Sequence, residues 1–376
     1  MTRGGTLTVL HLVANRWWTG SAEPVIQLMR GLSARGHRVL LGLIRGDRFE
    51  QKAREAGFEP LPGLSLEARV NPLGLLRDLS RLRSLVKAER VDLIHCHHSH
   101  DHWLGWLCAR PAALVRTFHN VRAVRSSWPS TALYRGTHAA IAVSREIEDR
   151  CRGAGIAAAA VHRIDGVVDL ARFAGPTDGA WLKRELGVTG GPVVGSVARL
   201  AANRHHETLI RGFRLLLPDY PGARLLLVGK GEARPRLEAL AQQLALTERV
   251  LFVGYRDTDL PDILHALDAF VLMDAGSDES GRAVLEAMAA ARPVVARRVG
   301  ALPDTVVHGV TGLLLDDDTP EAVARALRAV LEASAPARRM GEAGRRRAED
   351  SFSPARHAEH VETVYGAALA RRARAR

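Results

Sequence analysis

The stretch that decides the fold spans residues 269–316 and reads AFVLMDAGSDESGRAVLEAMAAARPVVARRVGALPDTVVHGVTGLLLD. It opens with the apolar run Ala269–Met273, which has the composition of a buried strand. From Ser280 onward, apolar residues recur at helical spacing, so one face of a helix can be buried. Pro293 ends this helix, and Val294–Ala296 is expected to form the next buried strand. The stretch therefore predicts a strand–loop–helix–strand unit of an α/β protein.

The amino end of this helix is expected to lie at the carboxyl end of the preceding strand. The backbone N–H groups of Ser280, Gly281 and Arg282, with the helix dipole, favour an anion such as a diphosphate. Gly281 lacks a Cβ, so a phosphate can approach its backbone closely. Asp278 and Glu286 flank the helix start, and carboxylates are acceptors for sugar hydroxyls. Two interpretations fit: a sugar-nucleotide site, or an ordinary amphipathic helix after an exposed acidic loop.

The spacing of residues around this helix has a counterpart in a known family. The pattern is Asp278-x7-Glu286, followed by Ala287-Met288, Pro293, Gly300, Pro303-Asp304 and Gly309-x-Thr311-Gly312. It resembles the signature of the family 4 retaining glycosyltransferases. That resemblance implies the GT-B fold, in which two doubly wound, Rossmann-like domains face a cleft. It also implies that Asp278 contacts the donor sugar and that Glu286 contacts the ribose of the nucleotide.

Three positions depart from the family signature. Asp278 stands where Glu is usual, Glu279-Ser280 replace Gly-Phe, and Asp304 replaces Glu. The Asp278 side chain is one methylene shorter than Glu, so the pattern leaves the donor sugar open. The departures at 278–280 also support the alternative to an enzyme, a non-catalytic sugar-nucleotide-binding protein of the same fold.

The composition is that of a globular protein with two domains. The chain has 376 residues, of which 47% are hydrophobic and 25% charged. Its three cysteines, Cys96, Cys108 and Cys151, have no CxxC spacing, so neither a disulfide framework nor a zinc site is expected. Residues 1–30 show no secretory pattern, and no apolar run approaches the ~18–20 residues that span a bilayer. We expect a cytoplasmic protein, with a peripheral position on the inner face of the membrane left open.

The net charge of +12 is unevenly distributed. Residues 1–172 carry 25 Lys and Arg against 15 Asp and Glu, residues 173–354 carry 23 against 24, and residues 355–376 carry 5 against 2. An anionic partner of the first half would explain this asymmetry, and so would an arginine-rich surface without such a partner. The partner would be a membrane surface, a nucleic acid or an acidic acceptor. No recognition motif supports nucleic acid, and we predict none as a partner.

Residues 1–172 alternate strand-like and helix-like segments, which predicts a doubly wound parallel sheet. The expected strands are Leu7–Val13, Arg38–Leu43, Leu93–Cys96, Leu114–Phe118 and Ala140–Val143. Ser21 is expected to cap a helix over residues 23–35, and Gly36 to end it. The loop Asn15–Gly20 lacks GxGxxG, which disfavours a dinucleotide dehydrogenase.

That loop is the first candidate site element. In the family that the chain resembles, a small residue such as Gly20 lies beside the donor diphosphate and the acceptor. Trp17 and Trp18 in the same loop would either stack on a sugar ring or pack in the core, and packing is the commoner role.

Histidines crowd residues 95–102, which read HCHHSHDH. Imidazole is the commonest metal ligand. These residues straddle a strand end and a helix start, however, so we do not expect them to converge on one point. We favour an active-site rim over a metal site. His119, which follows the next strand at its carboxyl end, matches the histidine that the family places over the donor sugar.

From about Phe173 the alternation restarts and predicts a second doubly wound domain. The expected elements are strand Pro192–Val197, helix His206–Leu217, strand Arg224–Val228, helix Glu232–Leu244 and a strand at Phe252-Val253. Asp165–Asp169 resembles the interdomain turn of the family. The last helix, Phe352–Leu369, is implied to return to the first domain. The expected domains are therefore residues 1–172 with 353–376, and residues 173–352.

Arg199 and Arg204 follow a strand of the second domain. The resemblance implies that they bind the diphosphate and neutralise the leaving group, and Arg at 204 in place of Lys keeps the charge. Two solvated arginines are the alternative. The resemblance further places the nucleotide near Gly229, Gly254, Tyr255 and Arg256.

We interpret the chain as a retaining, metal-independent glycosyltransferase of the hexosyltransferase type, without a cofactor. Its donor would be a UDP- or GDP-sugar. Its acceptor would be a hydroxyl of a glycan or lipid-linked molecule, in surface polysaccharide or lipopolysaccharide synthesis. The segment Leu73–Arg90 predicts a basic amphipathic helix, the pattern of a membrane-surface element. The alternative is a helix whose leucines pack on the sheet.

Overall fold

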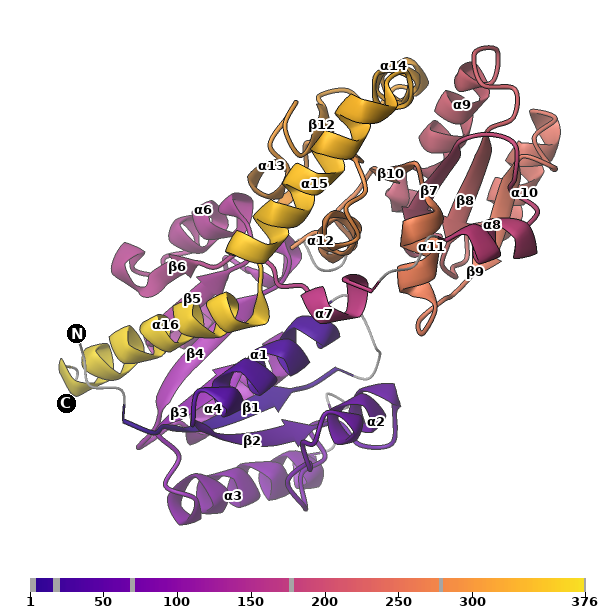
Figure 1. The fold of residues 1–376 in the computed structure, drawn as a ribbon. Helices are drawn as coiled ribbons and strands as arrows, with labels where there is room; N and C mark the ends of the chain where they lie inside the picture. Colours follow the sequence, from indigo (N-terminus) through magenta and orange to yellow (C-terminus); the bar gives the residue numbers. More distant parts are fainter. Residues whose placement is uncertain (1–4, 16–20, 68–71, 176–178, 277–279, 375–376) are drawn as a thin grey trace. The chain divides into compact units, whose positions relative to one another are not determined.

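The computed structural model describes residues 5–15, 21–67, 72–175, 179–276 and 280–374. The described chain forms two compact units, each a parallel sheet with helices on its faces (Figure 1). Unit 1 comprises the chain up to Gly166 together with the last helix from Pro354. Unit 2 comprises Val167–Gly276 and Ser280–Ser353. The α/β fold class expected from the sequence is confirmed in both units.

Unit 1 is built from six strands and the helices between them, closed by the C-terminal helix. In chain order its elements are β1 (Thr8–Val13), α1 (Ala22–Ala34), β2 (Arg38–Leu43), α2 (Arg48–Glu55), α3 (Pro72–Ala88), β3 (Leu93–Cys96), α4 (Ser99–Cys108), β4 (Ala113–Phe118), the 3₁₀ helix η1 (Val121–Ala123), α5 (Trp128–Arg135), β5 (Ala139–Ala142), α6 (Arg145–Gly153), η2 (Ala158–Ala160), β6 (Val161–Arg163) and α16 (Pro354–Arg374).

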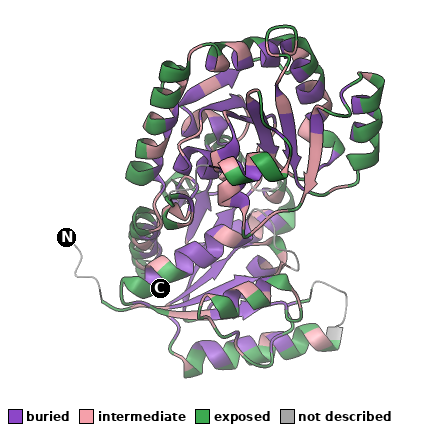
Figure 2. Ribbon diagram, turned by 45° about the vertical axis from the view of Figure 1, so that its right-hand side comes forward, coloured by how far each residue is buried: buried purple, intermediate pink, exposed green. Residues whose placement is uncertain are grey.

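The sheet of unit 1 has the strand order β2-β1-β3-β4-β5-β6, and all of its pairs are parallel. Its inner strands β3, β4 and β5 are buried throughout, whereas the edge strands β2 and β6 are partly exposed (Figure 2). On one face α16 packs beside α1, and Val361, Val364 and Tyr365 join a core with Val9 and Val115. The C-terminal helix thus completes the core of the N-terminal unit.

Unit 2 repeats the architecture with a second set of six strands. Its elements are α7 (Leu170–Phe173), α8 (Ala180–Glu185), β7 (Val193–Val197), η3 (Ala202–Arg204), α9 (His206–Leu216), β8 (Arg224–Val228), α10 (Arg234–Gln243), β9 (Val250–Gly254), α11 (Leu260–Ala266), β10 (Ala269–Leu272), α12 (Arg282–Ala289), β11 (Val294–Arg297), α13 (Leu302–Thr305), β12 (Gly312–Leu315), α14 (Pro320–Leu331) and α15 (Ser334–Ser351).

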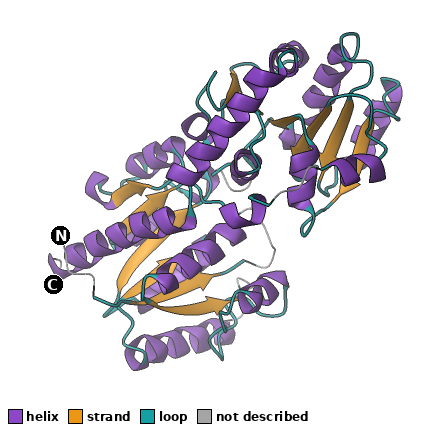
Figure 3. Cartoon of the chain, in the orientation of Figure 1, coloured by secondary structure: helices purple, strands orange, loops and turns teal. Residues whose placement is uncertain are grey.

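The sheet of unit 2 has the order β9-β8-β7-β10-β11-β12, again with every pair parallel (Figure 3). The chain reverses its direction of travel across the sheet between β7 and β10, and in unit 1 between β1 and β3. Such reversals open a crevice outside the carboxyl ends of the two strands, where doubly wound sheets bind ligands. Ligand-binding residues are therefore expected in the four loops that follow β1, β3, β7 and β10.

Several expected helices have different boundaries in the structure. The helix expected from Glu232 begins at Arg234, where Pro235 occupies the first turn and loses no helical hydrogen bond. The last helix begins at Pro354 and runs to Arg374, well past the expected Leu369. The strands β6 and β12, which were not predicted from the sequence, form one edge of each sheet.

The expected helix cap at Ser21 is wrong. Ser21 lies at the N-cap position of α1 with φ −79° and ψ −10°, and its side chain makes no capping hydrogen bond. A capping side chain normally needs extended backbone at this position, because only then does its oxygen reach the amides of the first turn. Gly36 ends the helix as expected, with φ +88°.

Candidate active site

In unit 2 the loops after β7 and β10 meet through an ion pair. Arg204, in the turn η3, pairs with Asp274, which follows β10, and its side chain is only 10% exposed. Oδ1 of Asp274 also accepts a hydrogen bond of 2.9 Å from the backbone N–H of Gly276. A Cβ on Gly276 would lie 3.3 Å from Nη1 of Arg204, so the guanidinium packs closely on this backbone. Arg204 is thus held beside the loop that leads into α12.

Arg199 is held in a different way. Its side chain is 68% exposed, and Nη2 lies 2.9 Å from Oε2 of Glu232. The backbone around it is fixed by hydrogen bonds from Ala198 N to Val228 O and from Leu200 N to Lys230 O, both 3.0 Å. The position of the Arg199 backbone is therefore determined, while its side chain reaches solvent.

The glycines after β8 are explained by the packing of neighbouring loops. Gly229 has φ +148°, and a Cβ there would lie 2.0 Å from the carbonyl oxygen of Ala198. A Cβ on Gly231 would lie 2.1 Å from the carbonyl oxygen of Leu200. Two backbones meet here, so Gly229 is required whether or not a nucleotide approaches the turn.

Gly254 is the last residue of β9, and Tyr255 and Arg256 follow it. The carbonyl oxygen of Gly254 accepts a hydrogen bond of 2.8 Å from Gly229 N, which joins the end of β9 to the glycine loop. Tyr255 is 41% exposed, and Nε of Arg256 lies 2.7 Å from Oδ2 of Asp259. A backbone hydrogen bond therefore connects the predicted positions Gly229 and Gly254, and the neighbours of Arg199 are bonded to Val228 and Lys230 beside Gly229.

Helix α12 begins at Arg282, with Gly281 as its N-cap in a left-handed conformation (φ +68°). A Cβ on Gly281 would lie 2.6 Å from Cδ2 of Leu302, so space as well as backbone conformation requires glycine. Ser280 and Glu286 are buried, and Nε of Arg282 lies 3.6 Å from Oε1 of Glu286. Each of these predicted donor-binding residues thus lies at or within the first two turns of the helix.

Four predicted positions lie outside the described residues: Asp278, Gly20, Trp17 and Trp18. Their predicted roles stay predictions.

Unit 1 has a cavity of about 320 Å³ at the crevice between β1 and β3. It is lined by Asn15 and Ser21 after β1, by His97, His98 and Ser99 after β3, and by Arg116, His119, Asn120, Arg122 and Ala123 from β4 onward. His119 is 5% exposed, and the centre of its ring lies 5.8 Å from that of His97 and 6.3 Å from that of His98. The predicted His119 and two histidines of the 95–102 segment therefore line one cavity.

A buried carboxylate that the sequence analysis missed fixes these loops. Asp101, in the first turn of α4, is fully buried. It accepts hydrogen bonds from the backbone N–H groups of Ala14 (3.1 Å), His97 (3.3 Å) and His98 (2.8 Å). The loops after β1 and β3 are both tied to it. The only sequence signal was an acidic residue three positions into a helix.

The expectation that the histidines would not converge is wrong for two of them. His95 and His97 meet His11 of β1, and one ring nitrogen of each lies within 4.8 Å of the others. Strand order is the reason, since β1 and β3 are neighbours and His11 lies opposite His95 in their register. Burial lowers the pKa of His11 to about 3 and the pKa values of His95 and His97 well below 6.5, so all three rings are neutral.

Hydrogen bonds account for much of this histidine cluster. Nδ1 of His11 lies 3.1 Å from Nε2 of His97. His95 uses both ring nitrogens, each at 2.7 Å, on the hydroxyl groups of Tyr365 and Thr117. Three neutral imidazoles could in principle hold a transition metal. Because His95 is already satisfied by two hydroxyl groups, we interpret the cluster as a buried hydrogen-bond network.

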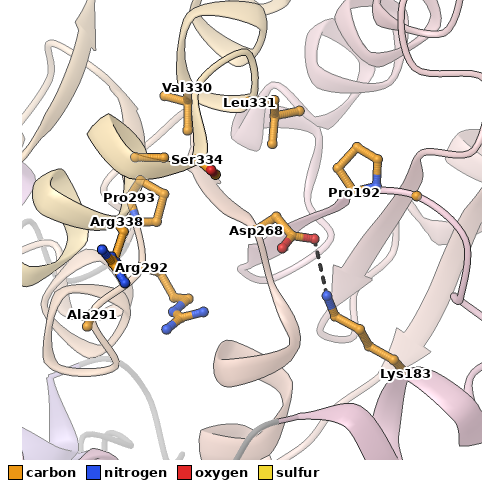
Figure 4. A pocket seen from close by; sticks show the side chains of 12 residues that line it. Lys183, Pro192, Asp268, Ala291, Arg292, Pro293, Val330, Leu331, Ser334 and Arg338 are labelled. Carbon is orange, nitrogen blue, oxygen red and sulfur yellow. Dashed lines mark hydrogen bonds and ion pairs between the residues drawn. The ribbon is translucent and has the colours of Figure 1, made fainter.

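A second cavity, of about 530 Å³, lies at the opposite edge of the sheet of unit 2 (Figure 4). Pro192, Asp268 and Pro293 line it, and they precede β7, β10 and β11. Its charged groups are paired: Lys183 lies 3.2 Å from Asp268, and Arg292 donates to backbone carbonyls. Amino ends of parallel strands are not where such sheets bind ligands. We therefore do not assign this cavity to the active site.

Membrane-spanning helices are absent from the described residues, where no helix is long and apolar enough to cross a bilayer.

Comparison with known proteins identifies the family. Residues 18–172 match the model of Glycosyltransferase Family 4, and residues 180–347 match that of Glycosyl transferases group 1. The D-inositol 3-phosphate glycosyltransferase of Nocardia farcinica is 33% identical over 309 residues, which cover 74% of this chain and 67% of that enzyme. The GDP-mannose-dependent alpha-(1-6)-phosphatidylinositol monomannoside mannosyltransferase of Mycolicibacterium smegmatis is 33% identical over 240 residues. This match covers 61% of the chain and 63% of the enzyme, less than two thirds of its length.

The fold agrees with that of solved structures. The Anabaena protein HepE, determined in complex with UDP-glucose, superimposes with a TM-score of 0.81 over 96% of this chain and 100% of its own, at 23% identity. Both halves of the chain match family models, and both units have the fold that the family requires. The chain therefore belongs to the family 4 glycosyltransferases of the GT-B fold.

Proposed function

We propose that the protein is a retaining, metal-independent glycosyltransferase that moves a sugar from a nucleoside diphosphate sugar to a hydroxyl of a glycan or lipid-linked acceptor. The observation that carries the proposal is the position of Arg204 at the β7/β10 crevice, beside the loop that enters α12. A cation fixed at this place is suited to a diphosphate that gains charge as it leaves.

The donor would lie along the loops of unit 2. Arg204, Arg199 and the amides of residues 280–282 would stabilise the departing diphosphate, because preorganised positive groups act most strongly where charge develops. Glu286 would accept hydrogen bonds from the ribose, and Asp278 would contact the sugar. Gly254, Tyr255 and Arg256 would lie against the base. The relatives suggest a GDP- or UDP-linked sugar, since one is named for GDP-mannose and HepE was solved with UDP-glucose.

In unit 1, His119 would lie over the donor sugar, at the edge of the histidine-lined cavity. Metal independence is supported by the side chains in the acidic run Asp316–Asp318. Asp316 pairs with Arg298 at 2.6 Å, and Asp318 lies 3.4 Å from His205, so this run serves exposed ion pairs. The protein would relieve charge on the diphosphate with its own cations.

The acceptor would be reached at a membrane surface. Leu73, Leu75 and Leu76 at the start of α3 are 75%, 42% and 62% exposed, whereas Leu82 and Leu85 later in the helix are buried in the core. The later leucines therefore pack in the core, and the exposed start of the helix is the part that we propose for the membrane surface. An exposed apolar cluster followed by exposed basic residues suits an anionic lipid surface. The named relatives that act on phosphatidylinositol monomannoside and inositol phosphate support such an acceptor, in surface glycan or glycolipid synthesis.

Binding of a panel of UDP- and GDP-sugars tests the proposal, followed by assay of sugar transfer with the donor that binds. One nucleotide family should raise the melting temperature. Glu286→Ala should weaken donor binding by about 2 kcal/mol or more, measured by calorimetry, because a charge-assisted hydrogen bond is lost. Glu248→Ala, at an exposed position outside the site, is the matched control. Unchanged donor affinity in folded Glu286→Ala would contradict the assignment, and donor binding without transfer would favour the non-catalytic alternative.

A further inference from the structure

Arg116 carries a full charge into the interior of unit 1. It lies near the end of β4, as the one charged residue in the run ALVRTF, and its side chain is 2% exposed. The guanidinium carbon lies 5.1 Å from the centre of the Phe118 ring. In the part of the chain that the structure describes, Nε and Nη1 have no hydrogen-bond partner. Buried arginine N–H groups are normally satisfied, so these two donors call for an acceptor.

The neighbouring carboxylate does not supply that acceptor. Nη1 of Arg116 lies 3.6 Å from Oδ1 of Asp101, which is beyond hydrogen-bonding distance. Asp101 already accepts three backbone hydrogen bonds and is fixed by them. Burial lowers the pKa of Arg116 and the charge of Asp101 raises it, so the carboxylate compensates the charge without using the donors.

The surroundings of Arg116 favour an anion. Arg116 lines the cavity of about 320 Å³ together with Arg122, which is exposed, and with Ser99 at the amino end of the ten-residue helix α4. The helix dipole adds positive potential there. Asn15 and Asn120 contribute amide groups, and no carboxylate belongs to the described lining of the cavity. A tetrahedral oxyanion could accept hydrogen bonds from the arginine fork while standing at the helix terminus.

We propose that this cavity binds a phosphate group of the acceptor, so that the enzyme glycosylates a phosphorylated glycan or lipid. The inference rests on the proposed function, because the donor diphosphate is assigned to the arginines of unit 2. The cavity of unit 1 has its own arginines, its own helix terminus and its own unsatisfied donors. It therefore has the chemistry to hold a second phosphate, separate from that of the donor.

The test is binding of inorganic phosphate and glycerol 3-phosphate to the full chain, with and without a saturating nucleoside diphosphate. Both probes should bind whether or not the nucleotide is present. Arg116→Met, close in volume and uncharged, should lose at least about tenfold in affinity for both probes while keeping nucleotide affinity. Because a buried substitution can impair folding, Arg122→Ser provides an exposed second variant, with an expected loss of about threefold.

Two results would overturn the proposal. Complete displacement of both probes by the nucleotide would assign the cavity to the donor's own diphosphate. Equal binding of the probes by wild type, folded Arg116→Met and Arg122→Ser would remove the phosphate from the cavity. Failure of the proposed function would give a different result. In that case no nucleotide sugar would bind the wild-type protein at the Glu286 site, independently of whether phosphate or glycerol 3-phosphate binds.

Discussion

At the carboxyl edge of the sheet of unit 1, the side chains of Arg116 and Asp101 are at most 2% exposed, whereas that of Arg199 at the same edge of unit 2 is 68% exposed. In unit 1 the loops after β1 and β3 are held by the buried carboxylate of Asp101, which accepts hydrogen bonds from their backbone N–H groups. Unit 2 ties its loops with backbone-to-backbone hydrogen bonds across the glycine turns. The same sheet architecture therefore supports an edge fixed by buried charged groups in unit 1 and an edge that presents an exposed arginine in unit 2.

The difference suits two kinds of ligand contact. The exposed side chain of Arg199 can adjust as a diphosphate arrives, whereas Arg204 is held by Asp274 and is preorganised for the charge that develops. Buried and fixed groups cannot reorient, so they select a ligand by shape and by the donors they already present. Three experiments test this contrast between the units.

Acid should destabilise unit 1 more than unit 2. Burial holds the pKa of His11 near 3 and lowers those of His95, His97 and His102 well below 6.5, whereas in unit 2 the deeply buried His206 has a pKa of about 4. Below pH 6.5 the histidines of the unfolded chain are protonated, whereas the buried histidines of the folded chain stay neutral. The free energy of unfolding therefore decreases as the pH is lowered. His11 alone should contribute a loss of about 2 kcal/mol between pH 7.5 and pH 5.

Peptide-resolved hydrogen exchange at the two pH values measures this loss separately in each unit. His11→Gln keeps a hydrogen-bonding side chain that does not titrate, so it should remove about 2 kcal/mol of the pH dependence of unit 1. His360→Gln, at an exposed position of α16, should leave the pH dependence unchanged. Equal acid sensitivity of the two units would contradict the contrast in burial.

Turnover should depend strongly on Arg204. If the guanidinium acts on the departing diphosphate, Arg204→Ala should reduce kcat about 100-fold or more, with a smaller change in apparent donor affinity. Arg211→Ala, on the exposed face of α9, is the control for removing a surface arginine from the same unit. A variant that keeps its turnover and loses only affinity would make Arg204 a binding residue.

The smallest expected effect concerns the start of α3. Replacing the exposed Leu76 by serine should weaken co-sedimentation with anionic liposomes about fivefold, equivalent to about 1 kcal/mol of partial burial of an apolar side chain. Leu215→Ser is the matched control, since Leu215 is 39% exposed on unit 2. Binding should disappear in neutral lipid and weaken as salt rises. Equal pelleting with both lipids, or none with either, would leave a soluble acceptor.

Most of the fold was predictable because its strands are continuous apolar runs. The expected strands Arg38–Leu43, Leu93–Cys96 and Arg224–Val228 are confirmed to the residue. Elements that rest on short or unremarkable sequence were missed, such as the three-residue strand β6. The first residues of helices were predicted less accurately than the bounds of strands. A proline in the first turn, or a serine that does not cap, shifts the residue at which a helix begins.

The candidate site was predictable only where a residue follows a strand. His119, Arg199 and Arg204 lie after strands, and a parallel sheet brings such positions to one edge. The meeting of His11 with His95 depends on β1 lying next to β3, and the sequence pattern does not reveal strand order. The need for glycine at 281 is partly a contact with Leu302, which is distant in sequence. In the sequence, Arg116 could be recognised only as the one charged residue of the strand ALVRTF.

The hydrogen bond between Tyr365 and His95 has a consequence for how the chain is made. Tyr365 belongs to the last helix, and it enters the core of the unit whose other residues are synthesised first. While a ribosome translates residues 167–353, the sheet of unit 1 has emerged without α16 to cover Val9, Val115 and His95. All strands of unit 2 are synthesised before α16, so unit 2 can fold on the ribosome while unit 1 still lacks the helix that completes its core. A truncation before α16 should therefore leave unit 2 intact and expose the apolar face of unit 1 to aggregation.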